Sequence, residues 1–313
     1  MLEQRGNIMK KSLHRTMIFG CLFVLTGLFL SAPALAQRID SGSVSGIWSC
    51  WYWDWVDDED PSLFDDGDAM NRFDILVSDS TYTNYAQWWE YQYHGPPQNP
   101  DKWWGHCHAW AGAACWERQP SKYKVIKNAA TGVKVKFRVR DRKGLMCEAY
   151  YNDASSSVAD FMISQPSPGL MWYALRQEIK GINPMWGKKR GFVGELYYGD
   201  QVWNYPIYKY KVTCWWDPSS GYYGTMTIWG ASDGNPKYAD WTDLYSMKLT
   251  YQFSGVQFDA YGMPYDGGEW IGTGPQSRPD SIWRPQYPST WATYLGNPYL
   301  YNEALDVILY KKQ

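Results

Sequence analysis

Two stretches of the chain alternate between hydrophobic and polar residues. Apolar residues from Val133 to Val139 alternate with basic ones, and residues 245–253 alternate apolar with polar side chains. A period of two directs every second side chain to one face, which is typical of a half-buried strand. Three further stretches also predict strands, namely residues 191–196, 207–216 and 225–229.

The segments before this region predict helices instead. Residues 68–77 predict a short helix capped by Asp68, and residues 82–93 predict another. Residues 107–116 are alanine-rich, and their larger apolar positions share one helical stripe. Helices followed by a mainly antiparallel sheet indicate an α+β fold.

Other stretches give weaker signals. Residues 169–179 favour either a strand or a helix, and residues 302–310 predict a closing strand or a short helix. Residues 254–298 are rich in Gly and Pro and show few regular signals. No linker interrupts the aromatic-rich sequence, so we expect residues 37–313 to form a single domain.

The first 36 residues have the pattern of a secretory leader. Basic residues precede an apolar run over residues 17–30, which is followed by small residues that end at Ala36. This order predicts a signal peptide that is cleaved before Gln37, and a secreted or periplasmic protein that leaves the membrane after cleavage. The alternative is a retained membrane anchor, which Pro33 and the small-residue ending disfavour.

Composition and charge exclude several classes of protein. The formal net charge is −2, and the predicted leader carries +3, so the remaining 277 residues carry −5. This mild acidity argues against nucleic acid as a partner. Aromatic residues make up 18% of the chain, which excludes disorder, and 28 Gly with 18 Pro exclude a coiled coil.

Five cysteines remain after the leader, and this odd number leaves at least one thiol unpaired. Export permits disulfides. We expect Cys107 to be the unpaired residue and any disulfides to come from the other four, which are Cys50, Cys115, Cys147 and Cys214.

Cys107 has the sequence context of a reactive thiol. It comes after a glycine turn and opens a predicted helix, whose free N–H groups and positive dipole end favour a thiolate and can stabilise an oxyanion. The tryptophans around it are placed to exclude water. The alternative is a buried structural cysteine or one half of a disulfide.

Several segments of the chain resemble the transglutaminase elicitor family of secreted microbial enzymes. The most specific are the Cys-His-x-Trp and Val-Trp-Asn-x-Pro segments. The segments are, in order, Gln87-Trp-Trp-Glu90 with His94, Trp104-Gly-His-Cys-His-Ala-Trp-Ala111, Val139-Arg-Asp-Arg-Lys-Gly-Leu145, Ser167-Pro-Gly-Leu-Met-Trp-Tyr-Ala-Leu175, Gly191-Phe-Val-Gly-Glu195, Gln201-Val-Trp-Asn-Tyr-Pro206, Met226-Thr-Ile-Trp229, Arg278-Pro-Asp-Ser-Ile-Trp283 and Asn297-Pro.

The resemblance implies a papain-like, transglutaminase-like fold and a cysteine acyltransferase. In that family the thiol attacks a glutamine carboxamide and a lysine amine resolves the thioester. Cys107 falls at the nucleophile position and Glu195 at the orienting acid. The resemblance then implies a protein or peptide substrate as the partner. It also implies an enzyme that acts as a monomer, without a cofactor or metal. We expect four tryptophans to line the substrate cleft, namely Trp103, Trp104, Trp110 and Trp203.

The base position departs from the family pattern. Trp172 occupies it, and an indole cannot accept a proton. No histidine follows residue 108. We therefore expect Trp172 to lie against Cys107, with its N–H near Glu195, and we expect a scarce thiolate.

The upstream histidines are weaker candidates for the base. His106 would have to fold back on Cys107, and His108 does not face it, because neighbours on a helix point apart. We expect His108 to be a hydrogen-bonded supporting residue and His94 to be an exposed loop residue.

Two functional hypotheses remain, a transglutaminase-like acyltransferase and an inactive relative whose Trp-lined cleft binds a peptide or glycan. Metal chemistry has little support in the sequence. The acidic residues from Asp54 to Asp68 suit calcium, but they do not match an EF-hand, and a solvated acidic surface is the preferred interpretation. No Cys/His set has zinc spacing.

Overall fold

The computed structural model describes residues 37–54, 61–98, 105–151, 159–181, 190–285 and 296–310. The predicted leader and its cleavage site lie outside these residues. Within them, no helix combines the length and the apolar character needed to cross a membrane.

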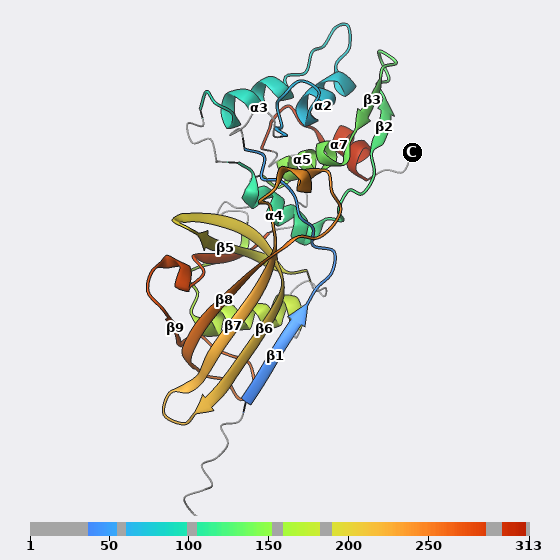
Figure 1. The fold of residues 1–313 in the computed structure, drawn as a ribbon. Coiled ribbons are helices and arrows are strands. Elements are labelled where there is room, and N and C mark those ends of the chain that lie inside the picture. Colours follow the sequence, from blue (N-terminus) through green and yellow to red (C-terminus); the bar gives the residue numbers. More distant parts are fainter. Residues whose placement is uncertain are drawn as a thin grey trace, which may run out of the picture.

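An eight-stranded sheet curls into a half-barrel and forms the larger layer of the molecule (Figure 1). Every neighbouring pair of its strands is antiparallel. The strand order is β4 (Ala159–Ser164), β10 (Ser281–Pro285), β5 (Phe192–Tyr198), β6 (Gln201–Asp217), β7 (Gly221–Ala231), β8 (Ser246–Val256) and β9 (Glu269–Ile271), with β1 (Gln37–Ser43) paired to β6.

Strand β6 organises the sheet because two strands share one of its edges. Its first part pairs with β5, and its residues 209–215 pair with β1 on the same edge. Pairing with β7 on the other edge begins only at Ile207. Pro206, which has no N–H to donate, therefore lies where β6 has a partner on one side only.

The helices form two groups. Helix α6 (Pro168–Ala174) continues into a π-helical turn, η2 (Leu175–Lys180), and packs with it against β8, β1 and β6. The other group lies above the sheet in the view of Figure 1 and also contains the β2–β3 hairpin. Its elements are α2 (Ala69–Val77), α3 (Ala86–His94), β2 (Lys124–Lys127), β3 (Lys134–Phe137), α5 (Val139–Ala149) and α7 (Asn302–Leu309).

Helix α4 (Cys107–Trp116) connects the two layers. It packs against β5, β6 and β10 on one side and against α5 on the other. Residues 109–115 are all buried, because small alanine and glycine side chains let both layers approach the helix closely.

The α+β class predicted from the sequence is confirmed. The predicted helices correspond to α2, α3 and α4, and the predicted strands to β3, β5, β6, β7 and β8. Val139, which was assigned to a strand, instead begins α5. The ambiguous residues 169–179 are helical, and the closing element is helix α7.

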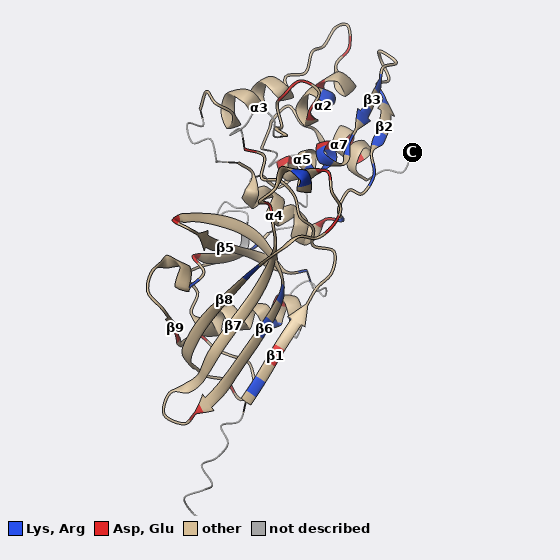
Figure 2. Cartoon of the chain, viewed as in Figure 1, with Lys and Arg blue, Asp and Glu red and all other residues tan. Residues whose placement is uncertain are grey.

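Basic residues gather on β2, β3 and α5, whereas the sheet carries few charges (Figure 2). Several of them hold the helical layer together. Arg142 donates to the carbonyl oxygens of Ile308 and Leu309 at the end of α7, and Arg138 pairs with Asp68 at 2.6 Å.

Lys143 fastens α5 to two distant segments. It is fully buried, and its ammonium group donates to the carbonyl oxygens of Ser49, Tyr238 and Trp241 at 2.7–2.8 Å. Three acceptors match the three protons of an ammonium group, so this buried charge is fully hydrogen-bonded.

We predict that Lys143→Met lowers the free energy of unfolding by about 3 kcal/mol or more, because three buried carbonyl oxygens lose their donor. Lys134→Met, at an exposed position of β3, is the control and should change it by about 0.5 kcal/mol at most. Denaturant unfolding of both variants measures the difference, and equal effects would contradict the role of Lys143.

Candidate functional site

Cys107 opens α4 and is half-buried at the edge of a pocket of about 450 Å³. The pocket lies between the start of α4, the end of α3 and the first residues of β6. Its lining residues are Tyr93, His94, Gln98, Gly105, His106, Cys107, His108, Tyr151, Val202 and Trp203.

Gly105 determines where this helix begins. A Cβ atom on residue 105 would lie 2.2 Å from the carbonyl oxygen of Tyr52, so only glycine fits there. The next N–H, of His106, donates to that same oxygen. The start of α4 is therefore held against the segment that contains Tyr52.

Three N–H donors surround the sulfur of Cys107. The side-chain amide of Asn204 donates at 3.6 Å, and the backbone N–H groups of Asn204 and His108 also face the sulfur. The amide has a fixed orientation, because its oxygen accepts from the indole of Trp283 at 3.1 Å. Burial, together with the charge of Asp233, nevertheless raises the pKa of the thiol to about 11.

Glu195 belongs to the same group of residues but does not reach the thiol directly. It lies opposite Asn204 on β6 and opposite Ser281 on β10. Its carboxylate accepts from the Ser281 hydroxyl and from Trp283, and burial raises its pKa. Trp283 and Asn204 thus connect Glu195 to Cys107, and the donors to Glu195 are not imidazoles.

Trp172 is placed differently from the prediction. It is fully buried, its indole N–H donates to Asp40 at 2.9 Å, and its ring contacts Phe253 and Phe258. The indole N–H is therefore directed at Asp40 and not, as expected, at Glu195. Asp40 also pairs with Lys180 and Arg176, so a buried carboxylate on β1 decides the position of this indole.

The structure places the tryptophans that we expected to line the cleft in different surroundings. Trp203 lines the pocket, where its ring meets Tyr52 edge-on at 4.9 Å. Trp110 is fully buried and donates to the carbonyl oxygen of Trp48, so its assignment to the cleft is wrong. Trp103 and Trp104 lie outside the described residues.

His108 has the supporting role that the sequence suggested. Its Nε2 is 2.7 Å from the carbonyl oxygen of Tyr151, and this atom must be the donor because a carbonyl only accepts. Burial, together with the charge of His106, lowers its pKa to about 4. The ring is therefore neutral and held by Tyr151.

Asp233 is a candidate that sequence reasoning missed. Its side chain is buried, and one of its oxygens has no hydrogen-bond partner in the described part of the chain. Burial raises its pKa to about 7. Its charge acts on the Cys107 thiol, and a pKa near 7 gives it a proton affinity suited to a general base.

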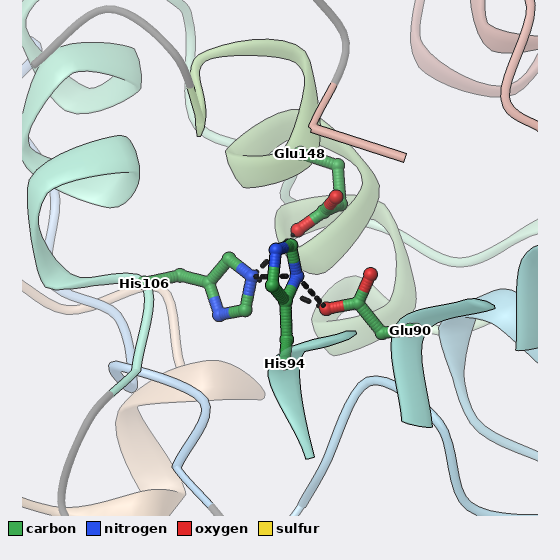
Figure 3. A group of neighbouring side chains, drawn as sticks. All are labelled: Glu90, His94, His106 and Glu148. Carbon is green, nitrogen blue, oxygen red and sulfur yellow. Dashed lines mark hydrogen bonds and ion pairs between the residues drawn. The ribbon is translucent and has the colours of Figure 1, made fainter. Parts of the chain in front are cut away.

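A second set of titratable groups adjoins the pocket (Figure 3). Glu90, His94, His106 and Glu148 each bring one nitrogen or oxygen atom to a common point. His94 is not the exposed loop residue that we expected, because it ends α3 and is largely buried. The spacing of Glu90 and His94, one helical turn apart, is the signal that could have revealed this set.

The charges within this set shift its pKa values strongly. Burial opposes ionisation of Glu90, but hydrogen bonds from His106 and His94 outweigh it and lower its pKa to about 2. Burial likewise lowers the pKa of His106, but Glu148 and Glu90 raise it to about 10. His106 points into this set rather than back to Cys107, so it does not supply the missing base.

The remaining expectations concern cysteines and acidic residues. The five cysteines after the predicted leader are free thiols, and those of Cys50 and Cys147 share a hydrogen bond in the core. Asp54 accepts from the hydroxyl of Tyr52, and Asp68 pairs with Arg138. Both aspartates are buried, so the interpretation as a solvated surface is wrong for them; residues 55–60 lie outside the described residues.

We predict that Trp172→Phe leaves the alkylation rate of Cys107 unchanged, because the indole N–H donates its hydrogen bond to Asp40 and not to the thiol. Loss of the N–H to buried Asp40 should lower the free energy of unfolding by about 1–2 kcal/mol. Native-state alkylation followed by peptide mapping measures the rate, and denaturation measures the stability. A clear change in the rate would restore the earlier placement of Trp172.

Asp233 should make stability depend on pH. Its folded-state pKa of about 7 lies above the unfolded value of about 3.9, so the folded state binds the extra proton and loses stability as pH rises toward 7. Between pH 5 and pH 7 the loss is roughly 2–3 kcal/mol. We expect Asp233→Asn to abolish this loss. Parallel pH profiles of unfolding for the two proteins would show that Asp233 is not the cause.

Comparison with known proteins adds no family to this picture: no family model, no curated protein and no solved structure matches the chain. The resemblance to the transglutaminase elicitor family therefore stays a prediction, and the geometry at Cys107 has to support any functional proposal.

Proposed function

We propose that the chain is a secreted, transglutaminase-like thiol acyltransferase of papain-like fold, with Cys107 as its nucleophile. The observation that carries this proposal is the group of N–H donors around one half-buried thiol at the start of a helix, beside an open pocket. Such donors stabilise an oxyanion. The antiparallel sheet behind α4 also supports the proposal, because it supplies Asn204 and Glu195 from neighbouring strands.

The proposed reaction uses these groups, with Asp233 as the base. The sulfur attacks the carboxamide carbon of a glutamine side chain, and the thiol proton passes to the Asp233 carboxylate. The oxyanion accepts from the Asn204 amide and from the backbone N–H groups at the sulfur. When the C–N bond breaks, Asp233 returns the proton and ammonia leaves. An amine then attacks the thioester and gives a proton to Asp233. The C–S bond breaks, and the leaving sulfur takes that proton back from Asp233 to restore the thiol.

Glu195 acts through other residues in this scheme. It accepts from Trp283, which in turn holds the oxygen of Asn204. It is therefore a positioning residue, which keeps the amide N–H groups of Asn204 directed at the sulfur. This role differs from orienting an imidazole, which is the role that the family resemblance implied for it.

The second candidate is an inactive relative that binds a peptide or glycan. The raised pKa of Cys107 favours it, since little thiolate exists at neutral pH. The pocket also offers aromatic rings, from Tyr93, Tyr151 and Trp203, which suit a peptide or a sugar face.

Incorporation of a labelled amine into a glutamine-rich protein tests the acyltransferase. We expect Cys107→Ala to abolish incorporation, and Asn204→Ala to lower kcat about 10²–10³-fold, because one oxyanion donor is lost. Cys115→Ala is the matched control. It removes a buried thiol from the far end of the same helix and should retain activity.

Two outcomes would contradict the proposal. Incorporation that survives in Cys107→Ala would mean that the thiol is not the nucleophile. A folded wild-type protein that binds the donor peptide but incorporates no amine would support the binding relative instead.

A further inference from the structure

The set formed by Glu90, His94, His106 and Glu148 brings together ligands from three elements. Glu90 and His94 come from one face of α3, His106 directly precedes α4, and Glu148 lies in the last turn of α5. One nitrogen or oxygen atom of each lies within 4.8 Å of all the others. In Figure 3 the two rings and the two carboxylates are directed at the space between them.

The separations between these atoms are close to those of a tetrahedral metal site. Bonds of about 2.0–2.2 Å place the ligand atoms about 3.3–3.6 Å apart. His106 Nε2 is 3.3 Å from His94 Nδ1 and 3.2 Å from Glu90 Oε1. Two other pairs are 2.7 Å apart, namely His106 Nε2 with Glu148 Oε1 and His94 Nδ1 with Glu90 Oε1. An ion would spread these two pairs by about half an ångström or more. The pairs of Glu148 with Glu90 and with His94, which lie within 4.8 Å, would adjust to the same spacing.

Protons satisfy this arrangement only in part. His106 Nε2 can carry one proton, yet Glu148, Glu90 and His94 all lie within 3.3 Å of it. Glu148 is fully buried. Its Oε1 lies 2.7 Å from His106 Nε2, while within the described part of the chain its Oε2 accepts no hydrogen bond. Buried carboxylates of this kind are normally paired, hydrogen-bonded or bound to a metal.

Neighbouring groups hold the ligands in place, as is usual around bound metals. The buried amide of Asn297 donates to the second oxygen of Glu90 at 3.3 Å and to the carbonyl oxygen of Ala86 at 2.8 Å. This leaves Oε1 of Glu90 directed at the histidines. The ring of Tyr151 stacks on His94, with ring centres 4.3 Å apart.

We propose that these four residues bind a divalent transition-metal ion, and that zinc is the ion they fit best. Two imidazole nitrogens and two carboxylate oxygens form a tetrahedral N₂O₂ set, whereas calcium and magnesium prefer oxygen alone. A dication with two carboxylates and two neutral imidazoles leaves no net charge to bury. His94 and His106 both line the pocket, which provides the path by which the ion enters.

The ion would fasten α3, α5 and the residue before Cys107 to one point. It therefore stabilises the wall of the pocket without touching the thiol, whose partner lies on β6. This proposal does not depend on the acyltransferase, because binding and stability report on the metal without any assay of turnover.

Zinc titration of the chain, without a histidine tag and stripped by a chelator, tests the site. We expect one ion per chain, a higher Tm with zinc in excess and, with cobalt, the visible absorption of a tetrahedral complex. Glu148→Gln, which conserves shape, and His94→Asn should weaken zinc binding at least 100-fold, since ligands matter more than their supporting groups. Circular dichroism checks that both variants fold.

Two matched controls separate this site from the thiol. His108→Asn removes a histidine from the same pocket, and Cys107→Ala removes the adjacent sulfur; both should bind zinc as the wild type does. If neither ligand variant folds, X-ray absorption of the zinc-loaded wild type still identifies the ligands of the ion. We expect nitrogen and oxygen ligands at about 2.0–2.2 Å and no sulfur. A folded wild type that takes up no zinc, a sulfur ligand, or unchanged binding in Glu148→Gln would leave an ion-pair cluster only and overturn the proposal.

Discussion

The backbone at Gly105 lies against the carbonyl oxygen of Tyr52 at a distance that leaves no room for a side chain. Trp53, next to that carbonyl, adopts a left-handed conformation with φ of 59°, which is unusual for a bulky residue and must be held by its surroundings. Together these two positions determine where α4 starts. Everything proposed for this protein follows from that start, because His106 and Cys107 are the two residues located there.

Consecutive residues at this point serve two different environments. His106 precedes the helix and turns toward α3 and α5, where it meets carboxylates. Cys107 is the first helical residue and faces β6, where it meets amide donors. Soft thiolate would compete for zinc if both side chains pointed the same way. The helix begins between them, with His106 outside it at φ −100° and ψ 29°, and this keeps the sulfur apart from the imidazoles.

Sequence patterns correctly predicted those helices and strands whose formation depends on neighbouring residues in the chain. The alanine-rich segment became α4 with the expected bounds, and the alternation over residues 245–253 became most of β8. Strand β10 escaped detection because all of its residues are buried, so it has no polar alternation. In the site, Cys107 could be chosen from its helix-start position. Asp233 and Glu148 could not, since their importance comes from burial and from neighbours that the sequence does not place. Trp172 was misplaced because a family pattern gives an order of residues but not the acceptor that a buried indole N–H will find.

The order of strands has a consequence for how the chain folds. Strand β1 pairs with β6, and β4 pairs with β10, in each case across a long stretch of intervening sequence. Contacts so distant along the chain carry a large loop-closure entropy, and proteins dominated by them fold slowly. Helix α4 packs on strands that include β10, which comes near the end of the chain. The surroundings of Cys107 are therefore complete only when the last strand of the sheet has joined.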